Sequence, residues 1–410
     1  MSRRYDDNPL MNNNYNGNRG PSWKKVLGIS LSVILGIVAI GGGVIYYVGH
    51  NLISLSNYVA DEDVQKVDQL PEAAKAQEIE SEEPVVLNES ELNSIHASMS
   101  TVSAVETVKD EDVYNLLLVG VDRRDKSWNG NSDSMMLVSI NFAKKRVSVV
   151  SLMRDTCVEI PGHGYEKMNA AYAYGGGPLL TQVISDTYKV DLSRYAAVDF
   201  EDMIDIVDAL GGIDLEMTDA EVNVANGYML DMCNTLGMNG YDYILPGGGV
   251  YHCNGVQAVA YARNRYVGNS DYARTERQRY VISQIIAEVK RMDALQLTQF
   301  VKNVLPLVTH NVEESEIWDL VTRAPEILQY TFVQDRIPYD NMYDTVSEML
   351  VPQWETTIEM LHNTIYGDGS ISDNSDNDKL NKVESSDEYT DDYPGLQSAE
   401  DENSADIVIQ

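Results

Sequence analysis

Three charged side chains stand next to the ends of consecutive strand-like runs. The runs span residues 113–121, 134–140 and 146–153. The short link NFAKK between the last two is typical of a hairpin turn. If successive strands alternate in direction, Asp122, Asp133 and Arg154 lie at the same edge of one sheet. Two carboxylates and a guanidinium there form either a structural ion-pair network or a hard-cation site beside an anion-binding arginine.

A second concentration of charge lies further along the chain. Five arginines fall within seventeen residues: Arg263, Arg265, Arg274, Arg277 and Arg279. Anion binding is the physical use that needs several guanidinium groups together. Arg263 and Arg265 are two residues apart, so they would point the same way on an extended segment. For Arg277 and Arg279, a surface helix with scattered salt bridges is the preferred interpretation.

The elements that must position these side chains alternate between strands and helices. Residues 200–212 carry apolar side chains at helical spacing, end in Gly211 and Gly212, and precede the strand-like run IDLEM. A long helix with Arg274 and Gln278 on one face near its start is also expected. Its buried face is marked by Val281, Ile282, Ile285, Ile286 and Val289. The alternation indicates an α/β sheet with helices on its faces.

Composition excludes several classes of protein. The chain has 410 residues, with 30 Lys and Arg against 64 Asp and Glu, giving a formal charge of -34. This balance argues against nucleic-acid binding, which needs a basic surface. Three cysteines are too few for a disulfide-framework protein. A hydrophobic content of 43% is enough for a substantial core.

The run Val26–Val48 contains twenty-three residues without a charge. It is long enough to span the hydrocarbon layer of a membrane, and too long for the apolar part of a cleaved signal peptide, which is the alternative. Lys24 and Lys25 precede it, whereas acidic residues open the downstream flank. The positive-inside rule therefore predicts a single transmembrane helix at 26–48, a cytoplasmic segment at 1–25, and the rest outside the cell.

Acidic residues also mark the expected domain boundaries. Residues 51–110 hold thirteen acidic and three basic residues, so 49–110 is predicted to be an extracellular stalk, solvated and holding at most a short helix. Residues 367–410 hold thirteen acidic and two basic residues and are predicted to form a disordered tail. The remaining residues, 111–366, are predicted to form one catalytic domain.

Seven ordered blocks carry a family resemblance. They are GVDRR (120–124), NSDSMML (131–137), SLMRDT (151–156), KMNAAYAYGG (167–176), LGGIDL (210–215), NGVQAVAYARNR (254–265) and DYARTERQ (271–278). Over residues 111–290 the sequence resembles the LytR–CpsA–Psr family of cell-envelope enzymes. The resemblance implies a three-layer α/β/α fold, in which a mixed central sheet lies between helices beside a hydrophobic lipid groove. It also implies a membrane-anchored phosphotransferase that moves a glycopolymer, such as teichoic acid or capsule polysaccharide, from polyprenyl pyrophosphate to peptidoglycan.

The resemblance assigns roles to individual residues. Asp122 and Asp133 match aspartates associated with Mg²⁺, for which Mn²⁺ is the alternative. The residues that match the pyrophosphate site are Arg124, Arg154, Lys167, Arg263, Arg265, Arg274 and Gln278. Asp271 matches an acidic residue near the metal and is a candidate general base, with metal-assisted deprotonation as the alternative. Asp122, Asp133, Arg154 and Asp271 are therefore the expected catalytic residues. Phosphoryl transfer needs such groups because catalysis is mostly positioning and charge neutralisation.

The sequence departs from the family pattern at one phosphate contact. Asn131 stands where the family usually has arginine, and Arg123 or Arg124 is expected to replace the lost contact.

The cysteines have separate expectations. Cys233 and Cys253 are predicted to form a disulfide because they lie in an exported region, whereas Cys157 is predicted to be a small buried apolar residue.

Three other functions compete with transfer. A transcriptional attenuator would need a cytoplasmic DNA reader, and the first 25 residues show no pattern of a helix-turn-helix. A polyprenyl-pyrophosphate phosphatase would use the same site with water as the acceptor. A structural wall-binding module would need no catalytic site. The expected partners are the lipid-linked glycopolymer, peptidoglycan and the membrane, with no nucleic acid.

Overall fold

The computed structural model describes residues 54–70, 87–123 and 127–367. The chain divides into two units, Met1–Ser54 and Leu55–Gln410, and every element below belongs to the second. Several predictions lie outside the described residues: the cytoplasmic segment, the transmembrane helix at 26–48, Arg124, and the tail from residue 368. Among the described residues, none of the helices combines the length and apolar character needed to span a membrane.

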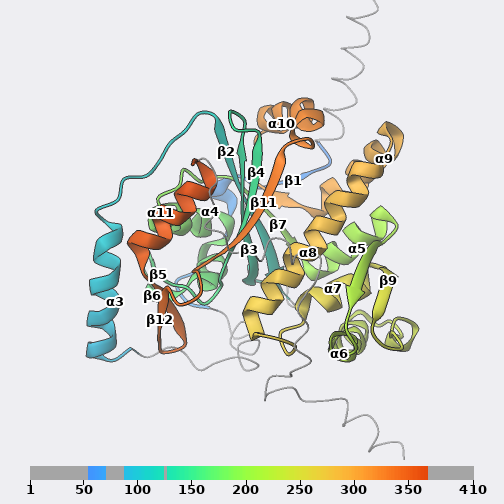
Figure 1. The fold of residues 1–410 in the computed structure, drawn as a ribbon, viewed down its shortest axis with the longest axis horizontal. Coiled ribbons are helices and arrows are strands. Elements are labelled where there is room, and N and C mark those ends of the chain that lie inside the picture. Colours follow the sequence, from blue (N-terminus) through green and yellow to red (C-terminus); the bar gives the residue numbers. More distant parts are fainter. Residues whose placement is uncertain (1–53, 71–86, 124–126, 368–410) are drawn as a thin grey trace, which may run out of the picture. The chain divides into compact units, whose positions relative to one another are not determined.

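A mixed sheet forms the centre of the domain (Figure 1). Its strand order is β1-β10-β7-β2-β3-β4-β11. The strands are β1 (Asn57–Tyr58), β2 (Val113–Asp122), β3 (Asn131–Asn141), β4 (Arg146–Leu152), β7 (Tyr195–Asp199), β10 (Thr309–His310) and β11 (Thr331–Ile337). The antiparallel order of β2, β3 and β4 confirms the predicted hairpin arrangement. Because β7 is parallel to β2 and β11 is parallel to β4, four strands end at the edge where β3 begins.

One face of the sheet is fully covered. The helices on this face are α4 (Met168–Tyr188) and α11 (Trp354–Ile365), with α3 (Glu89–Val102) beyond them. Alternating side chains such as Leu117 and Val119 of β2 and Leu137 of β3 are fully buried against them. This alternation fixes the strand register, since a shift of one residue would turn these apolar side chains to the other face.

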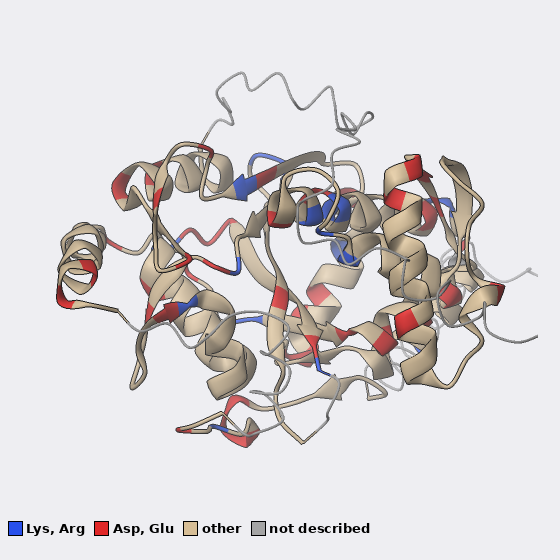
Figure 2. Cartoon of the chain, turned by 90° about the horizontal axis from the view of Figure 1, so that it is seen from below, with Lys and Arg blue, Asp and Glu red and all other residues tan. Residues whose placement is uncertain are grey.

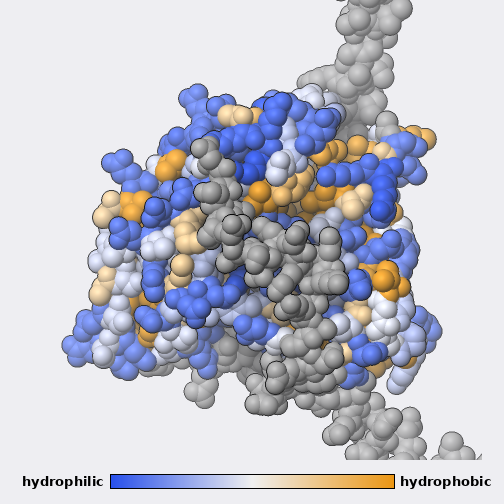
Figure 3. Space-filling model, viewed as in Figure 1, coloured by the Kyte–Doolittle hydropathy of each residue, from blue (hydrophilic) through white to orange (hydrophobic). Residues whose placement is uncertain are grey.

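The opposite face is covered less completely. The helices on this side are α5 (Phe200–Leu210), α6 (Asp219–Leu236), α7 (Gly255–Arg263), α8 (Ser270–Arg291), α9 (Ala294–Val304) and α10 (Glu314–Ile327). Leu118, Val138 and Ile140 of the sheet are only partly buried beneath α8 and α10. Figure 3 shows apolar side chains gathered at the surface between α10 and α9. The predicted three-layer α/β/α architecture is thus present, with one interlayer space packed loosely.

Short sheets and turns complete the domain. They are the pairs β5 (Cys157–Ile160) with β6 (Gly164–Lys167), β8 (Ile213–Met217) with β9 (Gly249–Cys253), and β12 (Tyr343–Val346) with β13 (Met349–Pro352), and 3-10 turns at Asp61–Asp63, Gly240–Asp242 and Leu305–Leu307. The predicted helix at 200–212 is α5, capped by the Asp199 carboxylate and ended by Gly211 at φ 92°. The predicted strand IDLEM is β8, which belongs to a small sheet rather than to the central one.

The predicted stalk at 49–110 is wrong for the part of it that the structure describes. Strand β1 pairs with β10 at the edge of the central sheet, and Val108 bridges to Val190. Helix α3 is closed by a capping box between Asn88 and Glu91, and its Ile95 is fully buried. The acidic and polar residues of α3 form its exposed face, so the charge count concealed a narrow apolar stripe.

The predicted disulfide is also wrong in this structure, where Cys233 and Cys253 are free cysteines. The physical reason is packing, because each thiol is fully buried in a different apolar cluster. Cys233 packs with Ala225 and Met229, whereas Cys253 packs with Ile213. Cys157 is buried as predicted, and burial raises the pKa of its thiol to about 12, so the thiol stays protonated at neutral pH.

Candidate active site

A β-bulge sets the positions of the two aspartates at the sheet edge. Gly120 lies opposite Ser134, while Asp122, the last residue of β2, lies opposite Asn131. Strand β3 therefore has one residue more than β2 between these pairs, and the extra residue is Asp133. A bulge redirects a side chain and often occurs next to active sites. A Cβ at Gly120 would lie only 2.9 Å from the Ser134 Cβ, so glycine is needed at this crossing.

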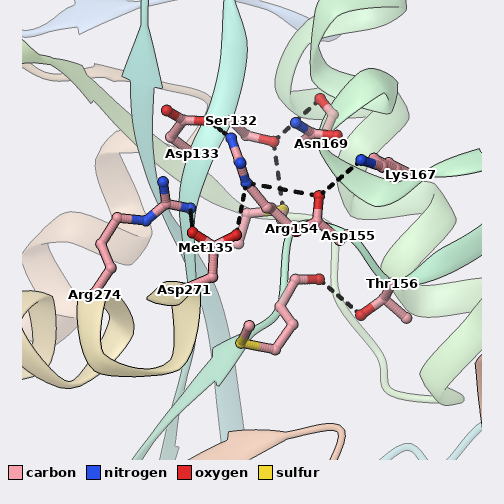
Figure 4. Close-up of polar contacts among 11 residues, drawn as sticks. Ser132, Asp133, Met135, Arg154, Asp155, Thr156, Lys167, Asn169, Asp271 and Arg274 are labelled. Carbon is pink, nitrogen blue, oxygen red and sulfur yellow. Dashed lines mark hydrogen bonds and ion pairs between the residues drawn. The ribbon is translucent and has the colours of Figure 1, made fainter. Parts of the chain in front are cut away.

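Arg154 is the centre of the charged cluster at this edge (Figure 4). Its Nη1 lies 3.1 Å from Asp133 Oδ1, and its Nε lies 3.2 Å from Asp271 Oδ2 and 3.7 Å from Asp155 Oδ1. Arg274 Nη2 lies 3.1 Å from Asp271 Oδ1, so the first turn of α8 contributes one carboxylate and one further guanidinium. Side chains from β3, from the segment after β4 and from α8 therefore meet at one place, as the strand alternation predicted for the first two.

Hydrogen bonds to main-chain carbonyl groups hold the segment after β4 in place. The Thr156 hydroxyl donates to the Met153 carbonyl at 2.7 Å, which closes a turn around Arg154. The Asn169 amide donates to the Arg154 carbonyl at 3.2 Å. Lys167, the residue before α4, places its Nζ 3.5 Å from Asp155 Oδ1. The turn is thus tied to the start of α4, and Lys167 joins the rim of the cluster as predicted.

The three carboxylates around Arg154 differ in their affinity for protons. Burial alone would raise the pKa of Asp133, but Arg154 and Arg274 outweigh it and hold the pKa below its ordinary value. Asp271 shows the same balance, so its pKa is also lowered. For Asp155, burial outweighs the attraction of Arg154, and with help from Asp271 it raises the pKa to about 7. The cluster therefore contains two firmly ionised carboxylates and one that titrates near neutral pH.

A second group of basic side chains adjoins this cluster. The Arg263 Cζ lies 4.6 Å from the centre of the Phe200 ring and 5.2 Å from that of Tyr228. Burial raises the pKa of Tyr228, while Arg263, Arg265 and Arg274 act to lower it, so all three cations lie within electrostatic range of one phenol. In Figure 2 acidic residues are spread over many elements, whereas several basic residues gather together. Arg154 and Arg274 are thus linked through Asp271, and Arg263 and Arg265 act on the same phenol as Arg274.

The expectation that Arg277 and Arg279 lie at the surface is wrong. Their side chains are only 3% and 7% exposed. Arg277 forms an ion pair with Glu221 at 2.8 Å, and Arg279 donates a hydrogen bond to the Ser151 hydroxyl at 2.8 Å. Both point inward because α8 packs against the sheet on one side and against α6 and α7 on another. Helical periodicity alone cannot show whether a given face of a helix meets solvent or a neighbouring element.

The remaining predicted residues have less specific positions. Gln278 is half-buried on α8, one turn after Arg274, as the spacing predicted. Arg123, a possible replacement for the missing family arginine at Asn131, lies 3.3 Å from Asp199 at the same sheet edge. No group of three or more His, Cys, Asp or Glu side chains is arranged to hold a metal ion within the described ranges.

Sequence reasoning missed several residues of the site. Asp155 was visible only as the residue after Arg154, and its raised pKa depends on burial that the sequence does not reveal. Phe200 and Tyr228, which lie beneath Arg263, come from α5 and α6 and have no local signal. The sequence signal for Asp155 was its position directly after the arginine of SLMRDT, since a charged residue at a strand end needs a partner.

The model of the LytR_cpsA_psr family matches residues 74–364. The chain is 31% identical over 246 residues to biofilm regulatory protein A of Streptococcus mutans, covering 56% of each chain. It is 30% identical over 260 residues to the polyisoprenyl-teichoic acid–peptidoglycan teichoic acid transferase TagU of Enterococcus faecalis, covering 61% of this chain and 78% of that one.

A solved structure resembles the fold. The crystal structure of protein gbs0355 from Streptococcus agalactiae superposes with a TM-score of 0.52 at 23% sequence identity, covering 65% of this chain and 90% of that chain. At this identity the likeness concerns the fold alone, and it agrees with the mixed sheet between helices described above.

Proposed function

Because the chain belongs to the LytR_cpsA_psr family, we propose that it transfers a glycopolymer from a polyprenyl-pyrophosphate carrier to a hydroxyl group of peptidoglycan. The observation that carries the proposal is the gathering of guanidinium groups near the carboxyl edge of the sheet, where Arg154 and Arg274 share Asp271, and Arg263 and Arg265 act on the same phenol as Arg274. Such a gathering suits a diphosphate, whose several negative oxygens require several guanidinium groups. The name of the Enterococcus faecalis relative describes a transfer of the same kind.

The reaction balances without a redox partner. The acceptor hydroxyl oxygen bonds to the phosphorus atom that carries the glycopolymer, and the bridging P–O bond to the second phosphate breaks. Polyprenyl phosphate leaves with the bridging oxygen, and the hydroxyl proton passes to a base. The arginines hold the diphosphate oxygens and offset the negative charge that spreads during transfer.

The aspartates at the sheet edge fit a magnesium ion. Asp133 is 20% exposed and its lowered pKa keeps it ionised, and Asp122 ends the neighbouring strand. Mg²⁺ typically takes only one or two carboxylates and completes its coordination with water and phosphate oxygens, so a pair is sufficient. When bound, the ion would supply charge neutralisation to the diphosphate.

The loosely covered face of the sheet is the proposed place of the lipid chain. Leu118, Val138 and Ile140 leave apolar surface partly open beneath α8 and α10. The apolar run at 26–48, which lies outside the described residues, would anchor the chain with this domain outside the cell. A polyprenyl chain could then leave the membrane and lie along the sheet with its head group at the cationic edge.

The central test separates transfer from hydrolysis. Full-length protein would be incubated with lipid-linked glycopolymer, peptidoglycan and Mg²⁺, and the products analysed by mass spectrometry. Transfer gives glycopolymer linked to peptidoglycan, whereas a polyprenyl-pyrophosphate phosphatase gives free phosphorylated glycopolymer. Free polymer alone would overturn the proposal and favour the hydrolase.

Val138→Trp should block the proposed lipid groove without disturbing the head-group site. We expect a loss of roughly tenfold or more in affinity for a long polyprenyl pyrophosphate, because the indole takes the space of several prenyl carbons. Affinity for geranyl pyrophosphate should change little, and calorimetric titration measures both. Val321→Trp is the control, since Val321 lies on the outer side of α10 and is 55% exposed. Equal losses for both lipids would argue against this groove.

Asp155 is the proposed general base, because its pKa of about 7 suits proton transfer better than the lowered pKa of Asp271. The carboxyl is protonated below pH 7 and cannot accept the hydroxyl proton. We therefore expect kcat to rise about tenfold per pH unit up to about pH 7 and then to level off. Asp155→Asn should lower kcat by roughly 10²–10⁴-fold and remove this rising limb. An unchanged limb in the variant would exclude Asp155 as the base.

A further inference from the structure

We propose that Arg277 is a positioning residue that holds Arg265 in the orientation needed to bind pyrophosphate. The inference rests on the proposed function, because it takes a diphosphate as the ligand of Arg265. Arg277 itself points away from that ligand and into the interior, where its side chain is 3% exposed. Its role would therefore be exerted through the main chain that carries Arg265.

The Arg277 guanidinium holds both ends of a four-residue segment. Its Nη1 donates to the carbonyl of Asn264 at 2.9 Å, and its Nη2 donates to the carbonyl of Val267 at 2.8 Å. Arg265 lies between these two acceptors. A planar guanidinium fixes the spacing of the two carbonyls, so the segment cannot bend without breaking at least one buried hydrogen bond.

The third donor of Arg277 fixes the guanidinium to α6. Its Nε donates to Glu221 Oε1 at 2.8 Å, and Glu221 Oε2 accepts from the Thr218 amide at 2.9 Å. Glu221 is thus both the partner of Arg277 and part of the capping box that begins α6. The guanidinium is therefore oriented by a rigid helix start, which gives a fixed reference for the Arg265 segment.

Hydrogen bonds within the segment of residues 264–267 also fix its conformation. The buried Asn264 side chain accepts hydrogen bonds from the amides of Tyr266 at 3.0 Å and Val267 at 3.3 Å. Arg265 then projects over the Tyr266 ring, with its Cζ 5.3 Å from the ring centre. Arg154 is among the charges that act on Arg265, so the two guanidinium groups lie within electrostatic range of each other.

A buried guanidinium also needs acceptors for the N–H groups that Glu221 does not take, and many carbonyl groups could serve. A buried ion pair contributes little net stability compared with apolar packing, so stability alone gives weak reason for it. The two additional hydrogen bonds to Asn264 and Val267 go to the one segment that carries Arg265. Positioning accounts for all three contacts of the guanidinium.

Arg277→Lys in the full chain tests the proposal. Lysine retains the positive charge beside Glu221, but its compact ammonium group lacks the fork that spans both carbonyls. We expect affinity for geranylgeranyl pyrophosphate with Mg²⁺ to fall roughly tenfold to a hundredfold, because even a small misplacement of a binding group can cause a loss of this size. Affinity for the neutral alcohol geranylgeraniol should stay within about twofold, since it does not use Arg265.

A double-mutant cycle separates positioning from general loosening. If Arg277 acts through Arg265, then Arg277→Lys should cause no further loss of pyrophosphate affinity in an Arg265→Ala background. Additive losses would overturn the proposal. If Arg277→Lys does not fold, the pair Arg277→Gln with Glu221→Gln removes both buried charges, keeps a capping side chain at residue 221, and is expected to give the same loss and the same non-additivity.

Arg146→Lys is the matched control. Arg146 is also buried, and its Nη2 donates to the carbonyls of Ile365 at 3.2 Å and Gly367 at 2.8 Å, but it lies at the opposite end of β4 from Arg154. This variant should lose stability without losing pyrophosphate affinity. If Arg265→Ala itself binds pyrophosphate like the parent, the proposed ligand is wrong. If Arg265→Ala loses affinity and Arg277→Lys does not, only the positioning role is refuted.

Discussion

Arg154→Ala is expected to lower turnover by on the order of 10³-fold, because it removes the central cation of the proposed diphosphate site. The same change leaves Asp133, Asp155 and Asp271 without the guanidinium that lies between them. Breaking a buried ion pair from one side typically costs about 3–5 kcal/mol, so the free energy of unfolding should also fall. Steady-state kinetics and denaturant unfolding measure the two effects separately.

The stability loss of Arg154→Ala should depend on pH in a defined direction. Arg154 helps to hold the pKa values of Asp133 and Asp271 below their ordinary range, which stabilises the fold at pH values where the unfolded carboxyls are ionised. That contribution is lost as pH falls through the folded-state values. The difference between parent and variant should therefore be largest near neutral pH and shrink below about pH 4.

Arg154→Lys is the control for charge. It should recover part of the stability, because an ammonium still offsets the carboxylates, but little of the turnover, because it cannot place two donors on one phosphate. Added guanidinium ion should partly restore turnover to Arg154→Ala and not to Arg154→Lys, whose side chain occupies the space. Turnover of Arg154→Ala within tenfold of the parent would exclude a central role for this residue.

The sheet edge could be predicted from the sequence because strand direction alternates. Asp122, Asp133 and Arg154 meet at one edge whatever the precise strand boundaries, and β2, β3 and β4 show this order. The bulge at Asp133 could not be predicted, since it depends on the close approach of Gly120 to Ser134. The alternation of strand direction thus predicts where the cluster lies, whereas the contact between Gly120 and Ser134 determines the direction of the Asp133 carboxylate.

Tertiary partners account for the errors. Arg277 and Arg279 look like surface residues on a single helix, and only the packing of α6 and β4 around α8 makes them buried. The acidic count of residues 49–110 indicated a stalk, whereas one apolar residue per two turns was enough to dock α3 through Ile95 and Val102. Charge counts describe the exposed face of a helix and carry little information about its buried face.

Asp133→Asn is expected to remove the proposed magnesium site while leaving the fold intact. The amide keeps the shape of the carboxylate and can remain near Arg154, but it supplies no charge to a divalent cation. Loss of several kcal/mol of charge stabilisation corresponds to a fall in turnover of about 10³-fold. Binding of Mn²⁺, followed by electron paramagnetic resonance without any substrate, should weaken about 10²-fold or more, which gives a readout independent of activity.

Asp271→Asn is the matched comparison, because Asp271 is likewise a partner of Arg154 with a lowered pKa. It lies on α8, however, whereas Asp133 stands in the bulge next to the strand that ends at Asp122. If the ion is held at the strand ends, Asp271→Asn should retain Mn²⁺ affinity within a few-fold while Asp133→Asn and Asp122→Asn lose it. Equal losses in all three variants would mean that the overall negative charge of the cluster attracts the cation. Unchanged affinity in Asp133→Asn would show that the two strand ends serve Arg154 as an ion-pair network rather than a metal.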